Sequence, residues 1–318
     1  MVDRAAGGPD RAADLGRGTV STGVVSPTPT AARASGIAVE YLKLTKPRVI
    51  SLLLVTTAAA MFTAARGVPN GWLILWTMVG GYLAAGGANA INHYVDRDID
   101  GHMKRTDARP VVAGSVTPRR ALVFGLACGG ASAALLAAAA NELAAVLAVM
   151  GLGVYVGIYT LWLKRSTIHN IVIGGAAGAF PPLVGWAAVT GHLGIYAWLM
   201  FAVVFYWTPP HFWALALLLQ NDYAAAGVPM LPVVHGEDAT RRQIFLWTIV
   251  MVGVTALPCA AGLAGWTYFV GALILNAVFV ALAFRLWRTH SSAHAKATFH
   301  YSLLYLALVF ALMAIDAA

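Results

Sequence analysis

Asn92, Asp96 and Asp100, within the stretch INHYVDRDID, have the residue types and the spacing of a metal site. Residues four apart lie on one face of an α-helix, because a turn takes 3.6 residues. At about 1.5 Å per residue, the three side chains would form a line of oxygen donors about 12 Å long. Mg²⁺ prefers carboxylate and amide oxygens, whereas a zinc site would need cysteine or several histidines. The spacing therefore predicts a magnesium site.

A basic run follows these acidic residues. HMKRTDARP contains Lys104, Arg105 and Arg109. Acidic ligands beside basic side chains suit a metal–diphosphate complex, because the carboxylates hold the metal and the cations neutralise the remaining phosphate charge. The acidic residues alone are equally typical of a solvated charge mixture at a helix end. Their spacing together with the basic run favours the diphosphate interpretation.

Further acidic residues lie in a second polar stretch, QNDYAAAGVPMLPVVHGED. Asp222 directly follows an apolar stretch, much as Asp96 does, and two such helix ends facing each other would clamp one diphosphate. Glu237 and Asp238 stand beside Arg241 and Arg242. We interpret that second pair as a solvated helix start.

Another candidate lies inside an apolar stretch, in YWTPPHFWAL. Pro209 and Pro210 remove backbone donors and predict an interruption of the helix. Interrupted membrane helices occur where they line a cavity, so His211 is a candidate for substrate contact. A histidine satisfied by the freed carbonyls is the alternative. Lys164 and Arg165 end another apolar stretch and are candidates for substrate binding or for anchoring at the membrane surface.

The elements that would position these residues are membrane helices. The chain is 59% hydrophobic and 11% charged, with a mean hydropathy of +0.73, whereas soluble domains are about a quarter charged. Cys128 and Cys259 lie in apolar runs, so we expect them to pack rather than to bind a metal. Stretches long enough to span a bilayer, roughly 20 residues each, lie near 49–66, 71–92, 119–140, 143–162, 168–190, 194–219, 244–264, 267–287 and 299–316.

The positions of the basic residues predict the orientation. With the N-terminus in the cytoplasm and the C-terminus outside, 20 of the 21 Lys and Arg residues lie inside, and only Arg66 lies outside. Such a bias follows the positive-inside rule. It accounts for much of the net charge of +8 without a nucleic-acid partner. Two inside connections, near 92–118 and 220–243, are longer than the rest, so the active face is expected to be cytoplasmic.

Residues 1–42 are predicted to be a disordered cytoplasmic tail, and 43–318 to be the membrane domain. The tail is poor in large apolar residues and cannot bury enough surface to offset its ordering entropy. It lacks the apolar core of a secretory signal. An arginine-rich transit peptide is the alternative, although three aspartates argue against it. We therefore expect a multi-pass protein of the plasma membrane rather than of the mitochondrial inner membrane.

The stretches quoted above also resemble a known family. NAINHYVDRDIDGHMKRTDARP fits NxxxDxxxD followed by MxRTxxRP and resembles the UbiA superfamily of intramembrane prenyltransferases. YTLWLKRSTIHNIVIGGAAGAFPPLVGW, WTPPHFWALAL and DYAAAGVPMLPVVHG are similar to its haem branch, the protohaem IX farnesyltransferases. The resemblance runs from about Lys43 to the last span. It implies an all-α polytopic fold, with nine transmembrane helices around a central cavity under a cytoplasmic cap.

The resemblance implies a reaction as well. A protein of this family transfers the farnesyl group of farnesyl diphosphate to a vinyl group of haem B, with addition of water, giving haem O and diphosphate. Mg²⁺ would be the cofactor. The family commonly has two aspartates before the tyrosine of the second motif, whereas this chain has Asn221 and then Asp222, which leaves the second metal site one charge short. The metal ligands implied are Asn92, Asp96, Asp100 and Asp222, and Arg105, Arg109 and Lys104 would face the diphosphate. Lys164, Arg165 and His211 are our further candidates for substrate binding.

Other functions and partners remain open from the sequence. Trp207, Phe212 and Trp213 would shield and stabilise an allylic cation, or they pack the core. A prenyltransferase acting on an aromatic quinone precursor would need the same diphosphate site. A haem transporter would more often show repeats with an ion site at mid-membrane. The lipid bilayer is one partner, and by family analogy a haem A synthase or an oxidase assembly factor is another.

Overall fold

The computed structural model describes residues 36–318, and all regular structure in that part is helical. Within the described residues nine helical segments are long and apolar enough to span a membrane, one of them the continuous run of α6, η1 and α7 over Glu142–Ser166, so the predicted all-α fold is confirmed. The helices are α1 (Ile37–Thr45), α2 (Pro47–Ala65), α3 (Gly71–Val95), α4 (Arg97–Asp100), α5 (Pro118–Ala139), α6 (Glu142–Gly153), the π-helix η1 (Val154–Leu163), α7 (Lys164–Ser166), α8 (Asn170–Thr190), α9 (Ile195–Leu218), α10 (Gln220–Ala225), α11 (Leu231–Ala260), α12 (Trp266–Thr289) and α13 (Ser292–Ala317).

Local sequence signals set several helix starts. Pro47 and Pro118 open α2 and α5, where a missing backbone N–H costs nothing. The side chain of Asn70 accepts from the backbone of the first turn of α3, and Thr117 does the same for α5. Asn141 caps α6, and its amide also donates to the carbonyl oxygen of Ala187 at 2.7 Å. That last contact fixes the start of α6 against the end of α8.

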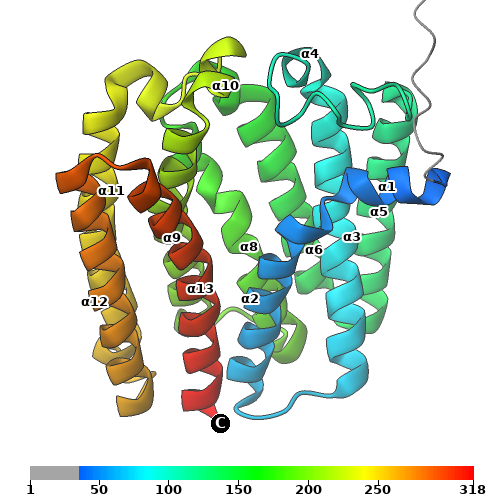
Figure 1. The fold of residues 1–318 in the computed structure, drawn as a ribbon. Helices are drawn as coiled ribbons and strands as arrows, with labels where there is room; N and C mark the ends of the chain where they lie inside the picture. Colours follow the sequence, from blue (N-terminus) through cyan, green and yellow to red (C-terminus); the bar gives the residue numbers. More distant parts are fainter. Residues whose placement is uncertain (1–35) are drawn as a thin grey trace, which may run out of the picture. The chain divides into compact units, whose positions relative to one another are not determined.

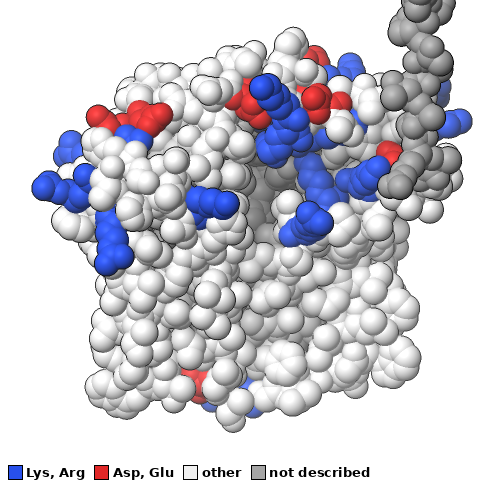
Figure 2. All heavy atoms as spheres, viewed as in Figure 1, with Lys and Arg blue, Asp and Glu red and all other residues white. Residues whose placement is uncertain are grey.

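In the described part of the chain, most charged side chains gather at one end of the helical bundle. Figure 1 shows α4 and α10 at this end and the C-terminus at the opposite end. Figure 2 shows Lys, Arg, Asp and Glu along the same rim, above a broad band almost free of charge. An uncharged band between two polar ends is what a bilayer requires. The two long connections therefore cap one end of the bundle, as predicted.

Small residues allow the helices to approach closely. A Cβ added at Gly87 of α3 would come within 2.6 Å of the Gly125 carbonyl oxygen in α5. One added at Gly185 of α8 would come within 2.2 Å of the Thr57 carbonyl oxygen in α2. Membrane helices pack through such positions because lipid supplies no hydrophobic drive between them. The first contact holds α3, which carries the candidate site, against α5, and the second holds α8 against α2.

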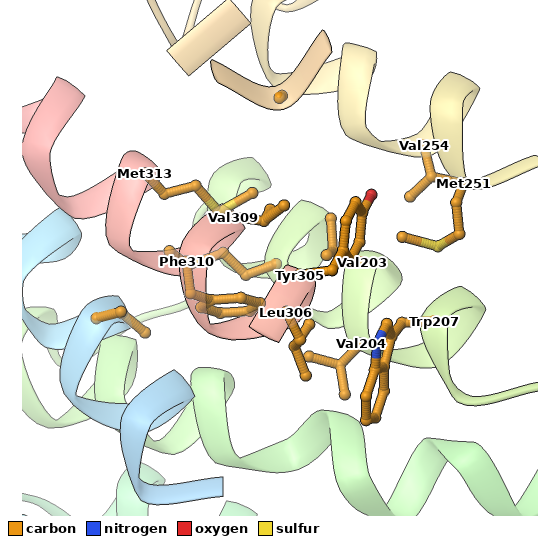
Figure 3. Close-up of a cluster of buried hydrophobic side chains, with 14 of the residues drawn as sticks. Val203, Val204, Trp207, Met251, Val254, Tyr305, Leu306, Val309, Phe310 and Met313 are labelled. Atoms are coloured by element: carbon orange, nitrogen blue, oxygen red, sulfur yellow. The ribbon is translucent and has the colours of Figure 1, made fainter. Parts of the chain in front are cut away.

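The largest apolar cluster lies between α9, α11 and α13. It includes Trp207 from α9, Met251 from α11, and Tyr305 and Phe310 from α13. Figure 3 shows these side chains packed together. The cluster fixes α9 and α13 against each other below the charged rim, which matters for His211.

The expected interruption of the helix at the proline pair is wrong. Pro209 and Pro210 lie inside α9, which runs unbroken from Ile195 to Leu218. A proline pair removes backbone hydrogen bonds, but lipid offers no other partners for the remaining backbone, so the helix continues through them. The hydroxyl of Thr208 also donates to the Val204 carbonyl oxygen at 2.8 Å. Pro181 and Pro182 likewise lie inside α8.

The second long connection is shorter than expected. It was expected over 220–243, but the structure forms α10 there and starts α11 at Leu231 rather than near 244. The actual interruption in α11 is Gly236, with φ of 81°, a conformation that glycine adopts without steric cost. The final span also starts earlier, at Ser292 rather than near 299.

The expected disordered tail, 1–42, falls largely outside the described residues. The described part of the chain starts at residue 36, and residues 37–42 belong to α1. The predicted boundary therefore falls within a helix.

Candidate active site

The three predicted metal ligands lie where α3 meets α4. α3 ends at Val95, and Asp96 occupies the junction with φ of −84° and ψ of 3°. Backbone bonds continue across it, from Asp96 N to the Asn92 carbonyl and from Asp100 N to the Asp96 carbonyl, both at 2.9 Å. This four-residue pattern keeps the three side chains on one face, as the spacing predicted. All three residues are buried.

Asp96 is fully buried within a network of donors. The amide Nδ2 of Asn92 donates to its Oδ2 at 2.6 Å, and Lys164 Nζ forms an ion pair with the same oxygen. Arg165 lies 3.5 Å from the other oxygen. A buried carboxylate needs such partners, because an unpaired charge there would be very costly. Lys164 and Arg165 therefore contact the acidic motif directly.

Asp100 is also fully buried, but only one of its oxygens is paired. Arg109 forms an ion pair with Oδ2, whereas Oδ1 has no hydrogen-bond partner in the described part of the chain. Burial raises the pKa of Asp100, although the Arg109 guanidinium opposes this. The hydroxyl of Thr106 donates to the Asp100 carbonyl at 2.7 Å and so folds the connection back onto the site. An enclosed unpartnered carboxylate oxygen is suited to an incoming cation.

Lys46 brings a further cation from the N-terminal side. Its Nζ donates to Asn92 Oδ1 at 2.9 Å. Burial, together with the charges of Arg109 and Lys164, holds the pKa of Lys46 well below its usual range. Three basic side chains thus lie close enough to disfavour one another's charge, and an incoming anion would relieve that repulsion.

The Asp98 side chain points away from the buried line of Asn92, Asp96 and Asp100. Arg165 donates to its two carboxylate oxygens at 2.6 and 2.7 Å, and these bonds lower the pKa of Asp98 to about 2. The Asp98 side chain is 59% exposed. This pair lies outside the buried line of donors.

A π-helix forms one wall of the site. In η1 the hydroxyl of Thr160 donates to the Tyr155 carbonyl at 2.9 Å and accepts from Asn92 Nδ2 at 3.3 Å. Backbone hydrogen bonds of such a helix join residues five apart, and here the Lys164 N–H donates to the Tyr159 carbonyl, so these two residues lie one above the other. Tyr159 packs on Gly174 of α8, where an added Cβ would come within 2.4 Å of the ring. π-helical turns are rare and frequently occur at functional sites.

The second connection packs on the first. Tyr223 of α10, Val228 and Met230 belong to one buried cluster with Met103, which lies between Asp100 and Arg109. Burial raises the pKa of Tyr223, and the Arg105 guanidinium beside it opposes this rise. Asp222 therefore lies at the same end as Asp100. Its half-buried carboxylate forms no ion pair within residues 36–318.

Not every predicted residue joins the buried group. Lys104 and Arg105 are exposed on the cap. Arg241 forms ion pairs with Glu237 and Asp238 and donates to the His290 carbonyl at 3.3 Å. That cluster joins α11 to the end of α12 and is separate from the site. His211 lies deeper, within α9.

The oxygen donors fit Mg²⁺ shared with a phosphate. Within the described residues no three His, Cys, Asp or Glu side chains converge to hold an ion. Mg²⁺ is commonly held by one or two carboxylates together with water and substrate phosphates, rather than by a protein cage. The enclosed Asp100 Oδ1 and the unpaired Asp222 supply such carboxylate oxygens.

Sequence reasoning missed three contributors. Lys46 was counted only as an inside charge, although it stands directly before the proline that opens a span. Thr160 and Tyr159 were overlooked because a regular α-helix would not align Tyr159 with Lys164. The five-residue interval between them is the signal that a π-helix makes significant.

The chain is similar to proteins of known family. Residues 53–309 match the model of the UbiA prenyltransferase family. The chain is 53% identical over 285 residues to the protoheme IX farnesyltransferase of Gloeobacter violaceus, covering 89% of this chain and 93% of that one. It is 54% identical over 280 residues to the protein of the same name from Chloroflexus aurantiacus, covering 88% of this chain. The chain spans only about half of some relatives, 48% of the C. aurantiacus protein and 52% of one from a Roseiflexus species.

Solved structures share the fold. A UbiA homologue from Archaeoglobus fulgidus bound to DMAPP and Mg²⁺ superposes with a TM-score of 0.64 at 16% identity, covering 87% of this chain and 99% of that chain. A structure from work on digeranylgeranylglyceryl phosphate synthase superposes with a TM-score of 0.72, also at 16% identity, covering 88% and 98%. At such identity these likenesses establish the fold alone.

Proposed function

The chain belongs to the UbiA prenyltransferase family, and from that premise we propose that it transfers the farnesyl group of farnesyl diphosphate to a vinyl group of haem B. Water adds to the vinyl group with loss of a proton, and haem O and diphosphate are the products. The observation that carries the diphosphate half is the line of Asn92, Asp96 and Asp100, with cations drawn to it from distant segments.

The residues of the site have separate tasks in this proposal. Asp96, Asp100 and Asp222 supply carboxylate oxygens for the metal, and Asn92 supplies an amide oxygen. Bound Mg²⁺ would neutralise diphosphate charge and stabilise the leaving group. Lys46 adds a nearby positive charge, and its hydrogen bond to Asn92 positions it.

The remaining cations stabilise the diphosphate as its negative charge grows. Arg109 and Lys164 are held in place by their carboxylate partners, so no reorganisation is needed when the C–O bond breaks. Exposed Lys104 and Arg105 attract the diphosphate from solution. Arg165 supports Asp96 and Asp98.

The apolar interior protects the reacting groups. Trp207 and Trp213 are buried in α9 and Phe212 is partly buried. Their rings exclude water from an allylic cation, and aromatic faces attract positive charge. The cation is captured by the vinyl group before water reaches it.

The relatives named protoheme IX farnesyltransferase are bacterial, which supports the plasma membrane as the location. We place the N-terminus in the cytoplasm, since the basic residues then lie inside. A haem A synthase or an oxidase assembly factor would take up the product.

The test uses purified protein in detergent with haem B, farnesyl diphosphate and Mg²⁺, followed by mass spectrometry of the extracted haem. We expect a haem that has gained a farnesyl group and one water. A parallel incubation replaces haem with a hydroxybenzoate, the acceptor of an aromatic prenyltransferase. Prenylation of the hydroxybenzoate but not of haem would overturn the proposal. Haem crossing a vesicle membrane without diphosphate release would indicate a transporter.

A further inference from the structure

His211 lies in α9, below the capped end of the bundle, between the aromatic rings of Trp207 and Phe299. It is seven residues before the end of α9 at Leu218, which is a depth of about 10 Å at about 1.5 Å per residue. Its imidazole stacks on Trp207, with centroids 4.2 Å apart and planes 17° apart. Phe299 of α13 stacks at 4.9 Å and 25°. Only 7% of the residue is exposed.

Ser302 fixes the tautomer of this ring. Its Oγ lies 2.7 Å from His211 Nδ1 and 2.6 Å from the Phe299 carbonyl oxygen. Two oxygens that close need a proton between them, and the carbonyl has none to give, so the serine donates to it. The serine oxygen must then accept from the histidine. Nδ1 therefore carries the proton, and Nε2 presents a lone pair.

That Nε2 atom has no partner within residues 36–318. Both ring nitrogens of His93 are fully enclosed, whereas His211 Nε2 is not, so this atom remains accessible to a ligand. No carboxylate contacts the ring among its hydrogen-bond and ring partners. An imidazolium there would be a buried unpaired charge, which is costly, so the ring is neutral. A neutral imidazole oriented through its other nitrogen is the usual form of a metal ligand.

The surroundings decide which metal species fits. No group of three His, Cys, Asp or Glu side chains capable of holding an ion occurs in the described part of the chain. A bare ion needs several protein ligands, whereas a metalloporphyrin brings four nitrogens and needs one axial ligand. The stacked rings of Trp207 and Phe299 hold the imidazole by its faces and leave Nε2, at its edge, as the ligating atom.

From this geometry we infer that His211 Nε2 binds the iron of the haem substrate, and that Ser302 is a positioning residue that holds the ring in the required tautomer. The inference rests on the proposed function, because it takes haem as the acceptor. It deepens that function, since iron ligation would fix the macrocycle at α9 and limit which peripheral group meets the farnesyl carbon.

The test is a spectroscopic titration of the purified full chain with ferric haem B, without farnesyl diphosphate. We expect the absorption and paramagnetic resonance spectra of histidine-ligated haem. His211→Ala should lose that signature, and added imidazole should restore it. Ser302→Ala should bind haem roughly tenfold more weakly. His300→Ala is the matched control, because His300 is exposed on the same helix α13 and bonds only the Lys296 carbonyl and a ring edge; it should behave as the wild type.

The outcomes separate the inference from the reaction. The His211→Ala variant must first elute at the wild-type position in size-exclusion chromatography, which shows that it is folded. Unchanged haem spectra in that variant would overturn iron ligation even if haem O is still made. Histidine ligation in a protein that never prenylates haem would sustain the inference and overturn the proposed reaction. A wild-type protein that binds no haem would overturn both.

Discussion

Two groups of buried polar side chains in this protein differ in how completely their hydrogen bonds are satisfied. The first joins α11, α12 and α13 within the membrane: Asn276 donates to Thr255 at 2.8 Å and accepts from the Tyr305 hydroxyl at 2.7 Å. The second is the site at the α3–α4 junction, where Asp100 keeps an enclosed unpartnered oxygen. A satisfied network fixes a structure. An incomplete one, crowded with cations, is arranged for a ligand.

The difference predicts which changes affect the reaction and which affect the fold. A buried polar atom without a partner costs roughly 1–3 kcal/mol. In the membrane network Asn276, Thr255 and Tyr305 are hydrogen-bonded to one another, so the fold itself avoids that cost. At the site it persists until substrate and metal arrive, so ligand binding should relieve it.

The largest effect is expected from removing one carboxylate charge at the site. Asp96→Asn or Asp100→Asn should lower kcat for farnesyl transfer by on the order of 10²–10³, or roughly 3–4 kcal/mol, because stabilisation of the leaving diphosphate is lost. The measurement is haem O formation at matched amounts of folded protein. Asn276→Ala is the control and should retain near-normal kcat. Equal losses in the control would mean that general destabilisation, rather than chemistry, causes the effect.

A smaller effect is expected from the ligands themselves. Mg²⁺ with inorganic diphosphate should stabilise the wild type by about 2.7 kcal/mol at a hundredfold excess over Kd, seen as a rise in the unfolding temperature in detergent. Chelation of the metal should remove the rise and abolish turnover. Asn276→Ala should keep the full rise, whereas Asp100→Asn should lose most of it. A rise of the same size in Asp100→Asn would show that the diphosphate binds elsewhere.

The membrane network should respond in the opposite way. Asn276→Ala deprives the Tyr305 hydroxyl of its acceptor and should lower the free energy of unfolding by about 1–2 kcal/mol. Tyr305→Phe removes the hydroxyl itself and should cost less, because no donor is left unsatisfied. Thermal unfolding of both variants checks the order. A larger loss in Tyr305→Phe would indicate that ring packing against Phe279, rather than the hydrogen bond, dominates.

The same contrast explains what the sequence could predict. Asn92, Asp96 and Asp100 were found because four-residue spacing on a helix is a local property. The nine spans were found because the bilayer fixes their length. Lys46 could not be found this way, since its bond to Asn92 joins residues 46 apart and depends on how α1 and α2 pack on α3.

The helix irregularities were also beyond reach. The π-helix depends on Tyr159 fitting over Gly174 of another helix. The proline pair in α9 looks like a break locally, yet both prolines are buried among neighbouring helices, which keep the helix continuous. Satisfaction of the Asn276 network, too, depends on three helices meeting. Long-range packing decides such features, and a single segment does not encode them.

The smallest effect should come from the exposed edge of the site. Arg165→Ala removes the pair with Asp98, whose side chain is 59% exposed, and exposed pairs contribute about 1 kcal/mol or less because water screens them. It also removes the longer 3.5 Å contact with Asp96, which keeps Lys164 and Asn92 as partners. We expect haem O formation within a few-fold of the wild type. Lys164→Met is the matched comparison, because Lys164 is buried against Asp96, and it should reduce kcat/KM by roughly a hundredfold. If Arg165→Ala proved as damaging as Lys164→Met, the arginine would have to contact the diphosphate directly, and the site would extend from the buried line to the surface.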